Sequence, residues 1–196
     1  MNLKTKIMIA EGLGLAAIAY LLTEKEEAPL RTELERFVGI MHKDVAKPIR
    51  DFIREVEATT GYRVEVASSH RGWNWSQQIW NSNPSVQACC PVGRDYHFFG
   101  FAIDIVLHGP LGRLGLAAPR SSWEATGIRA IARKYKLQWG IDFAGYYDPV
   151  HFALPLYGIN DLVNRAVQKY GSLQACGENG PNIDTTGLSL RTWQIA

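Results

Sequence analysis

Cysteine is scarce in this chain, and its spacing excludes one common type of zinc site. The three cysteines are the adjacent pair Cys89 and Cys90 and the distant Cys176. None of them shows the C-x-x-C spacing of structural zinc sites. Two interpretations stay open. In an exported domain one of the adjacent pair would form a disulfide with Cys176, and otherwise all three are free, mostly buried thiols.

A surplus of charge of either sign is also missing. The sequence has 21 Lys and Arg against 19 Asp and Glu, a net charge of +2. It therefore gives no electrostatic argument for a nucleic-acid partner. The 46% hydrophobic and 20% charged fractions are typical of a globular protein, and 196 residues can bury a substantial core.

The apolar run at residues 7–22 is short for a membrane-spanning helix. It would extend about 24 Å as a helix, less than the ~30 Å of the bilayer core. Lys4 and Lys6 precede it and an acidic stretch, residues 24–27, follows it, as in a membrane segment with its N-terminus inside. We expect residues 1–27 to be a membrane anchor or a signal peptide, which Ala17 and Ala19 would allow to be cleaved. A helix buried in protein is the third interpretation.

The rest of the chain alternates between helical and strand-like patterns. We expect residues 28–171 to form one domain and residues 172–196 to form a polar tail extended over its surface. Expected helices cover residues 32–58, divided at Pro48, then 73–81, 121–135 with Ser121 and Glu124 as a capping box, and 160–170. Expected strands cover residues 62–67, 100–107 and 151–154.

The stretch from Arg94 to Val106 contains an aspartate where an apolar strand is expected. Asp104 lies inside the apolar run 101–107, where an unpaired carboxylate would cost several kcal/mol. His97 precedes it by seven residues, and Gly100 between them fits a tight turn. A metal ion bound by His97 and Asp104 would explain the buried carboxylate.

A second histidine and carboxylate pair follows further along the chain, at Asp148 and His151. Two histidines and one aspartate as ligands, with one acidic residue left over as a base, make a hydrolytic zinc site. The ligand set would leave the metal one net positive charge. Asp148 would then lie beside an attacking water and take its proton.

These residues resemble the LAS-type zinc peptidases of bacterial cell-wall metabolism, which include VanX/VanY-like D,D-peptidases and the L-alanyl-D-glutamate endolysins of phages. The family pattern S-x-H-x-x-G-x-A-x-D corresponds to residues 95–104, with Asp95 in place of the serine. The acidic residue and histidine of its second half correspond to Asp148 and His151, and the pair Trp139 and Gly140 is similar to the endolysin branch. The resemblance covers residues 62–153.

The resemblance implies an α+β fold of the hedgehog/D-Ala-D-Ala peptidase type, with a small antiparallel sheet flanked by helices, to which the N-terminal hydrophobic helix would be added. It implies Zn²⁺ held by His97, Asp104 and His151, with Asp148 as the base. Arg71 would stabilise the oxyanion or hold a substrate carboxylate. The implied substrate is the peptidoglycan stem peptide, cut by a protein that faces the cell wall from a membrane or after export. A phage or virion origin follows from the endolysin-like second half.

Other interpretations remain beside this one. A D,D- or L,D-carboxypeptidase would have the same fold, and a catalytically inactive wall-binding protein would keep the metal for stability. The facial triad of iron oxygenases is discounted, because its first two ligands lie two residues apart rather than seven. For His42, His70 and His108 we expect structural or surface roles.

Overall fold

The computed structural model describes residues 34–82, 91–110 and 112–191. The chain divides into two compact units, Met1–Arg36 and Phe37–Ala196. The expected N-terminal hydrophobic helix lies outside the described residues. Within the described part of the chain, no helix is long and apolar enough to cross a membrane. The second unit contains all of the expected site residues.

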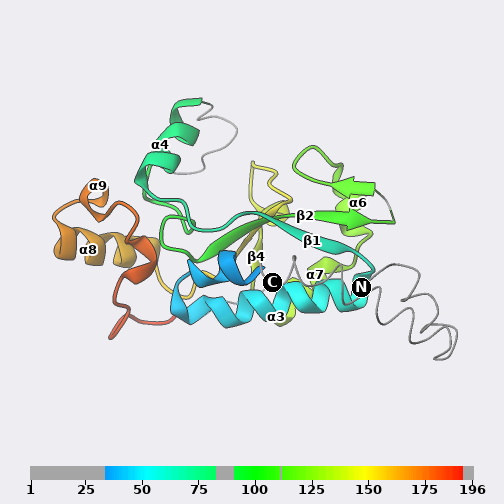
Figure 1. The fold of residues 1–196 in the computed structure, drawn as a ribbon, viewed down its shortest axis with the longest axis horizontal. Helices are drawn as coiled ribbons and strands as arrows, with labels where there is room; N and C mark the ends of the chain where they lie inside the picture. The colour runs from blue at the N-terminus through cyan, green and yellow to red at the C-terminus, as the bar shows by residue number, and fades with distance from the viewer. Residues whose placement is uncertain (1–33, 83–90, 111, 192–196) are drawn as a thin grey trace, which may run out of the picture. The chain divides into compact units, whose positions relative to one another are not determined.

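A small antiparallel sheet forms the centre of this unit (Figure 1). Its strand order is β1-β2-β5-β4, and β3 pairs with the outer end of β2. The strands are β1 (Arg63–Ser68), β2 (Ala102–Gly109), β3 (Gly112–Leu114), β4 (Gln138–Trp139) and β5 (His151–Ala153). The longest strand, β2, is buried along most of its length. The expected α+β class with a small antiparallel sheet is confirmed.

Helices pack on this sheet and at its ends. They are α3 (Lys43–Thr60), α4 (Trp73–Ser82), α6 (Arg120–Glu124), α7 (Ile128–Lys134), α8 (Ile159–Tyr170), α9 (Leu173–Cys176) and the 3-10 turns η1 (Gly140–Asp142) and η2 (Gly180–Asn182). The long helix α3 runs along the sheet (Figure 1). Its buried face includes Ile49, Phe52 and Val56, and the Phe52 ring lies 5.0 Å from that of Phe152 on β5.

Three expectations about the helices were wrong. Pro48 lies inside α3, which begins five residues earlier because the His42 ring accepts a hydrogen bond from the Asp44 N–H and caps it. The expected helix 121–135 is divided into α6 and α7 at Gly127, whose φ of 76° is left-handed. Pro119, rather than Ser121, occupies the N-cap position of α6. Local pattern alone could not separate these short elements.

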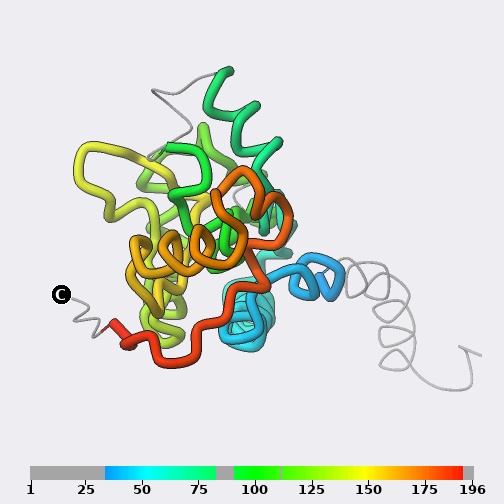
Figure 2. The backbone as a smooth tube through the Cα atoms, turned by 90° about the vertical axis from the view of Figure 1, so that its left-hand side faces the viewer, coloured from blue at the N-terminus to red at the C-terminus, as the bar shows by residue number. Residues whose placement is uncertain are grey.

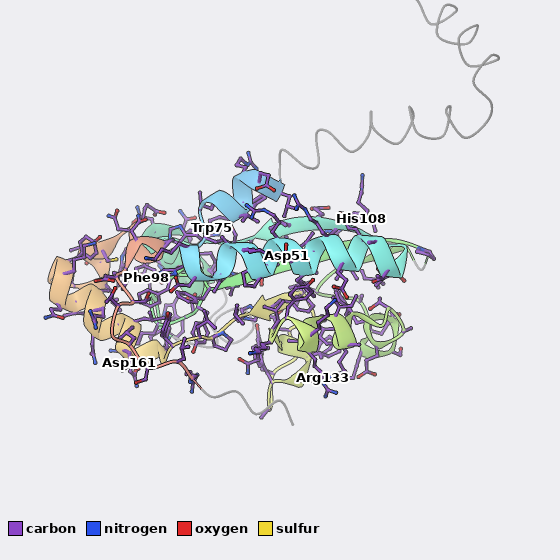
Figure 3. The ribbon with its side chains drawn as sticks, turned by 90° about the horizontal axis from the view of Figure 1, so that it is seen from below. Asp51, Trp75, Phe98, His108, Arg133 and Asp161 are labelled. Atoms are coloured by element: carbon purple, nitrogen blue, oxygen red, sulfur yellow. The ribbon has the colours of Figure 1, made fainter. Side chains whose placement is uncertain are left out.

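The C-terminal segment also differs from the extended tail that we expected. Residues 173–176 and 180–182 form α9 and η2, and Cys176, Gly180 and Ile183 are buried. The segment runs from α8 past the end of α3 (Figure 2), where the Ile183 carbonyl oxygen lies 3.0 Å from the His42 ring. Phe98 lies beside it (Figure 3), so close that a Cβ at Gly180 would overlap the Phe98 carbonyl. The tail therefore supports the loop that leads into β2.

Candidate active site

Strand register brings two of the expected ligands together. Asp104 on β2 pairs directly with His151 on β5, so both side chains leave the same face of the sheet. On the other side, Asp104 pairs with Ser68, and the register shift between Val66 and Ser68 marks a bulge at the end of β1. Such bulges re-aim side chains next to active sites. The chain then continues from Ser68 to Arg71.

The third expected ligand, His97, comes from the loop before β2. The loop closes through hydrogen bonds from the Gly100 N–H to the His97 carbonyl (3.0 Å) and from the Phe101 N–H to the Tyr96 carbonyl (2.8 Å). Gly100 has a φ of 71°, which confirms the expected tight turn. Asp95 accepts a hydrogen bond from the Phe98 N–H at 2.9 Å. A serine hydroxyl can make the same kind of turn, so aspartate preserves the loop at this position.

The three ligand atoms form a nearly equilateral triangle. His97 Nε2 lies 3.1 Å from Asp104 Oδ1 and 3.0 Å from His151 Nδ1, and the last two atoms are 3.2 Å apart. A tetrahedral zinc ion with bonds of about 2.0–2.1 Å would place its ligand atoms roughly 3.4 Å apart. Among the described residues this is the one group of three such side chains. The triangle thus fits zinc after shifts of a few tenths of an ångström.

The protonation of His97 also suits a metal ligand. Its Nδ1 lies 2.7 Å from the Ser69 carbonyl oxygen, which can only accept a hydrogen bond. In the neutral ring the proton therefore sits on Nδ1, and the lone pair of Nε2 faces the triangle. Burial lowers the pKa of His97, against the opposing charge of Asp104. The ring is consequently neutral at pH 7.

Arg71 supplies positive charge at the edge of this triangle. Burial opposes ionisation of Asp104, but His97 and Arg71 outweigh it and hold the pKa of the carboxyl well below its usual range. Arg71 donates to Asp104 Oδ2 through Nη2 and to the Ser68 hydroxyl through Nε at 2.9 Å. Its Nη2 is also 3.0 Å from His97 Nε2. The structure thus places Arg71 at the site as an ion-pair partner of a ligand, and its role toward substrate stays a prediction.

Asp148 is positioned by the pair Trp139 and Gly140. The Trp139 indole N–H donates to the Pro149 carbonyl at 2.7 Å, and its ring stacks on Phe152. A Cβ at Gly140 would lie 2.3 Å from the Asp148 carbonyl oxygen and 3.1 Å from the His151 Cβ. Only glycine therefore allows this segment to pack so closely, which gives a physical reason for the tryptophan-glycine pair in the sequence.

Burial raises the pKa of Asp148 to about 6, partly opposed by the charge of His151 and increased by that of Asp104. Such a value is close to neutral pH, as a general base requires. The expected base therefore lies in an environment that keeps its proton affinity high.

One open cleft of about 700 Å³ is lined by the three expected ligands, by Asp148 and by Arg71. Trp75 and Ile79 of α4 line one part of it, and Phe143 and Tyr146 line another. Trp75 and Leu116, 49% and 45% exposed, are two of the few large apolar side chains exposed in the described residues. The cleft can hold an extended ligand with apolar and polar parts.

The other histidines lie outside this arrangement. His42 caps α3, and His108 pairs with Glu65 at 2.6 Å. Ser69 could not be found from the sequence, because its contribution is a backbone carbonyl that any residue could supply. Arg94 lines the cleft three residues before His97. Its place there could not be found from the sequence either, because Arg94 belongs to no motif.

Comparison with known proteins supports the resemblance. A family model described as D-alanyl-D-alanine carboxypeptidase matches residues 92–154, which include His97, Asp104, Asp148 and His151. The resemblance to the LAS-type peptidases is confirmed over this segment. No curated protein matches the chain. Among solved structures the chain is similar to the L-Ala D-Glu endopeptidase ChiX of Serratia marcescens, with 21% identity and a TM-score of 0.46 over 65% of this chain and 87% of that one.

Proposed function

We propose that this chain is a zinc-dependent peptidase that cuts a peptide bond in the stem peptide of bacterial peptidoglycan, as an L-alanyl-D-glutamate endopeptidase. The observation that carries the proposal is the triangle of His97 Nε2, Asp104 Oδ1 and His151 Nδ1, with separations of 3.0–3.2 Å, at the wall of an open cleft. Asp148, with a pKa near 6, lines the same cleft. The family match to residues 92–154 supports a peptidase rather than another zinc hydrolase.

The described side chains divide the reaction between them. His97, Asp104 and His151 would hold the zinc ion, which when bound supplies a Lewis acid for hydrolysis. Asp148 takes a proton from the water that attacks the carbonyl carbon. It then delivers this proton to the leaving amine nitrogen as the C–N bond breaks. Ionised Asp148 is the form that begins the reaction.

Arg71 contributes a permanent positive charge beside the ligand atoms. Ser68 and Asp104 hold its guanidinium in place, so little reorganisation is needed when charge develops on the substrate. Part of its charge is already balanced by Asp104. Its contribution to the oxyanion is therefore smaller than that of a free arginine in the same position.

Digestion of purified peptidoglycan tests the proposal. The wild type with zinc should release new amino termini, and Asp148→Asn should release them about 10²- to 10⁴-fold more slowly while binding one zinc per chain. Asp51→Asn is the matched control. It removes the same charge from the outer face of α3 (Figure 3), where Asp51 pairs with Lys47, and it should digest like the wild type. If no new termini appear although zinc is bound, the chain is a non-catalytic wall-binding protein.

A second candidate is a D,D-carboxypeptidase, because the matching family model carries that description. Mass analysis of the same digest separates the two activities. An L-alanyl-D-glutamate endopeptidase releases fragments that begin with D-glutamate, whereas a carboxypeptidase releases free D-alanine.

The proposal places the protein at the cell wall, either exported or held by a membrane segment at residues 7–22. Deletion of residues 1–27 and fractionation of cells test the anchor. The full chain should sediment with membranes and the shortened chain should not. Recovery of the full chain without detergent would rule the anchor out.

A further inference from the structure

Some charged side chains of the cleft are already bound by other groups of the protein, and others are not. Two arginines and four aspartates line it: Arg71, Arg94, Asp95, Asp104, Asp142 and Asp148. A stem peptide brings its own carboxylates to such a cleft, and each needs a cation or several N–H donors to replace water. Recognition of a substrate carboxylate therefore depends on which cation of the cleft is available.

Arg71 is already occupied. Its Nη2 is bound to Asp104 and its Nε to Ser68, and only 15% of its side chain is exposed. Arg71 binds Asp104 through Oδ2, whereas the ligand triangle uses Oδ1, so this carboxylate can keep Arg71 while Oδ1 holds the metal. Arg71 is thus part of the site's internal electrostatics and a poor choice for a second carboxylate.

Arg94 is the other cation, and it is exposed. Among the described residues, no group accepts a hydrogen bond from its guanidinium. Its backbone is nevertheless fixed, because the Arg94 N–H donates to the Pro91 carbonyl at 2.9 Å and Gly93 turns the chain with a φ of 73°. The side chain therefore extends from an ordered turn, three residues before the ligand His97.

Among the described residues no ion pair joins Arg94 to the four aspartates of the cleft, and three of these aspartates have other partners. Asp142 receives two hydrogen bonds from Arg129, at 2.6 and 2.7 Å. Asp95, its neighbour in sequence, uses Oδ1 to accept the Phe98 N–H. Asp104 is paired with Arg71. Within the described part of the chain, Arg94 consequently keeps its full donor set, a planar fork that matches a carboxylate.

We propose that Arg94 is a specificity residue that binds a free carboxylate of the substrate next to the scissile bond. The inference rests on the proposed peptidase function and gives it a substrate class. The preferred stem peptide carries a free α-carboxyl on the D-glutamate, and the peptide in which this carboxyl is amidated is a poor substrate.

The test compares two synthetic stem peptides that differ only in this group, acid or amide. The zinc-loaded wild type should prefer the acid by about 10- to 100-fold in kcat/KM, as expected for one charge-assisted pair. Arg94→Ala should lose most of this preference through a higher KM for the acid, with kcat little changed. Arg94→Lys should recover part of it. Arg113→Ala, an exposed arginine on β3 outside the cleft, is the matched control and should keep the full preference.

The outcomes separate the two proposals. If the wild type cuts both peptides equally well, or if Arg94→Ala keeps the wild-type ratio, the role of Arg94 is wrong while the peptidase stands. If the wild type cuts neither peptide nor whole peptidoglycan, the proposed function fails and the inference falls with it. Zinc content and melting temperature of each variant show whether a lost preference comes from a damaged fold. If both Arg94 variants are damaged in this way, Arg94 has a structural role and the proposed role in substrate binding is wrong.

Discussion

The sheet and the loop supply the site in different ways. On the sheet, Asp104 and His151 oppose each other through backbone pairing, and the register alone brings their side chains together. In the loop, His97 is brought to the same point by the turn at Gly100, the Asp95 hydrogen bond and the Ser69 carbonyl, together with a few backbone hydrogen bonds. The strand positions are thus fixed by many shared hydrogen bonds, whereas the loop position depends on a few specific ones. Substitutions on the two sides should differ accordingly.

The largest effect is expected on the sheet side. Asp104→Asn removes the anionic ligand and leaves Arg71 without its charge partner. Bound zinc should fall from one per chain to near zero. Activity should fall by at least ~10³-fold, which is part of the ~10⁶-fold or larger rate acceleration that enzymes typically provide. Zinc analysis after gel filtration and the peptidoglycan digest measure both. Glu65→Gln, on β1 of the same sheet, should change neither, and wild-type zinc content in Asp104→Asn would rule out this ligand set.

The second effect concerns the base and its pH dependence. The folded-state pKa of Asp148 is about 6, against 3.8 for the free side chain, so folding favours its protonated form. As pH rises from 3.8 to 6, the unfolded chain loses this proton first and the folded state loses stability. Above pH 6 the loss is complete, at up to ~3 kcal/mol.

Asp148→Asn cannot ionise, so in zinc-free protein it should be more stable than the wild type at pH 8 by up to ~3 kcal/mol. Below pH 3.8 the difference should vanish. Urea unfolding in the presence of a chelator, at both pH values, measures this. Asp51→Asn serves as the control, because Asp51 is ion-paired on the surface. An equal or lower stability of Asp148→Asn at pH 8 would contradict the raised pKa.

The third prediction concerns the close packing of Gly140 against Asp148. In Gly140→Ala the new Cβ would meet the Asp148 carbonyl at 2.3 Å, so the segment with Asp148 and His151 must move. We expect a loss of about 1–3 kcal/mol in unfolding free energy and up to ~10²-fold in activity. Gly39→Ala, with nothing within 4 Å of its Cβ, should keep wild-type activity and lose no stability, because alanine favours the helix more than glycine does. Wild-type activity in Gly140→Ala would show that the position of Asp148 is not critical.

This contrast also explains what the sequence could predict. His97, Asp104, Asp148 and His151 were recognisable because their chemistry and spacing are local properties of the chain. The strand register that pairs Asp104 with His151 was not predicted, because it joins two strands that are far apart in the chain. The division at Gly127 and the packing of Gly180 against Phe98 also depend on tertiary contacts between distant segments. The engagement of Arg71 by Asp104, which leaves Arg94 as the available cation, depends on three-dimensional geometry in the same way.

The smallest effect is expected at Asp95, on the loop side. Its carboxylate accepts the Phe98 N–H at 2.9 Å and so fixes the turn that carries His97. Asp95→Ala should lose about 1 kcal/mol of stability and weaken zinc binding by about 10-fold, because the loop must then be ordered by zinc itself. Asp95→Ser should retain most of both, since a hydroxyl can accept the same bond. Zinc titration of the wild type, Asp95→Ala and Asp95→Ser measures these affinities. Equal affinity in all three would mean that the Gly100 turn and the Ser69 carbonyl suffice to place His97, and the loop would then be as strongly determined as the sheet.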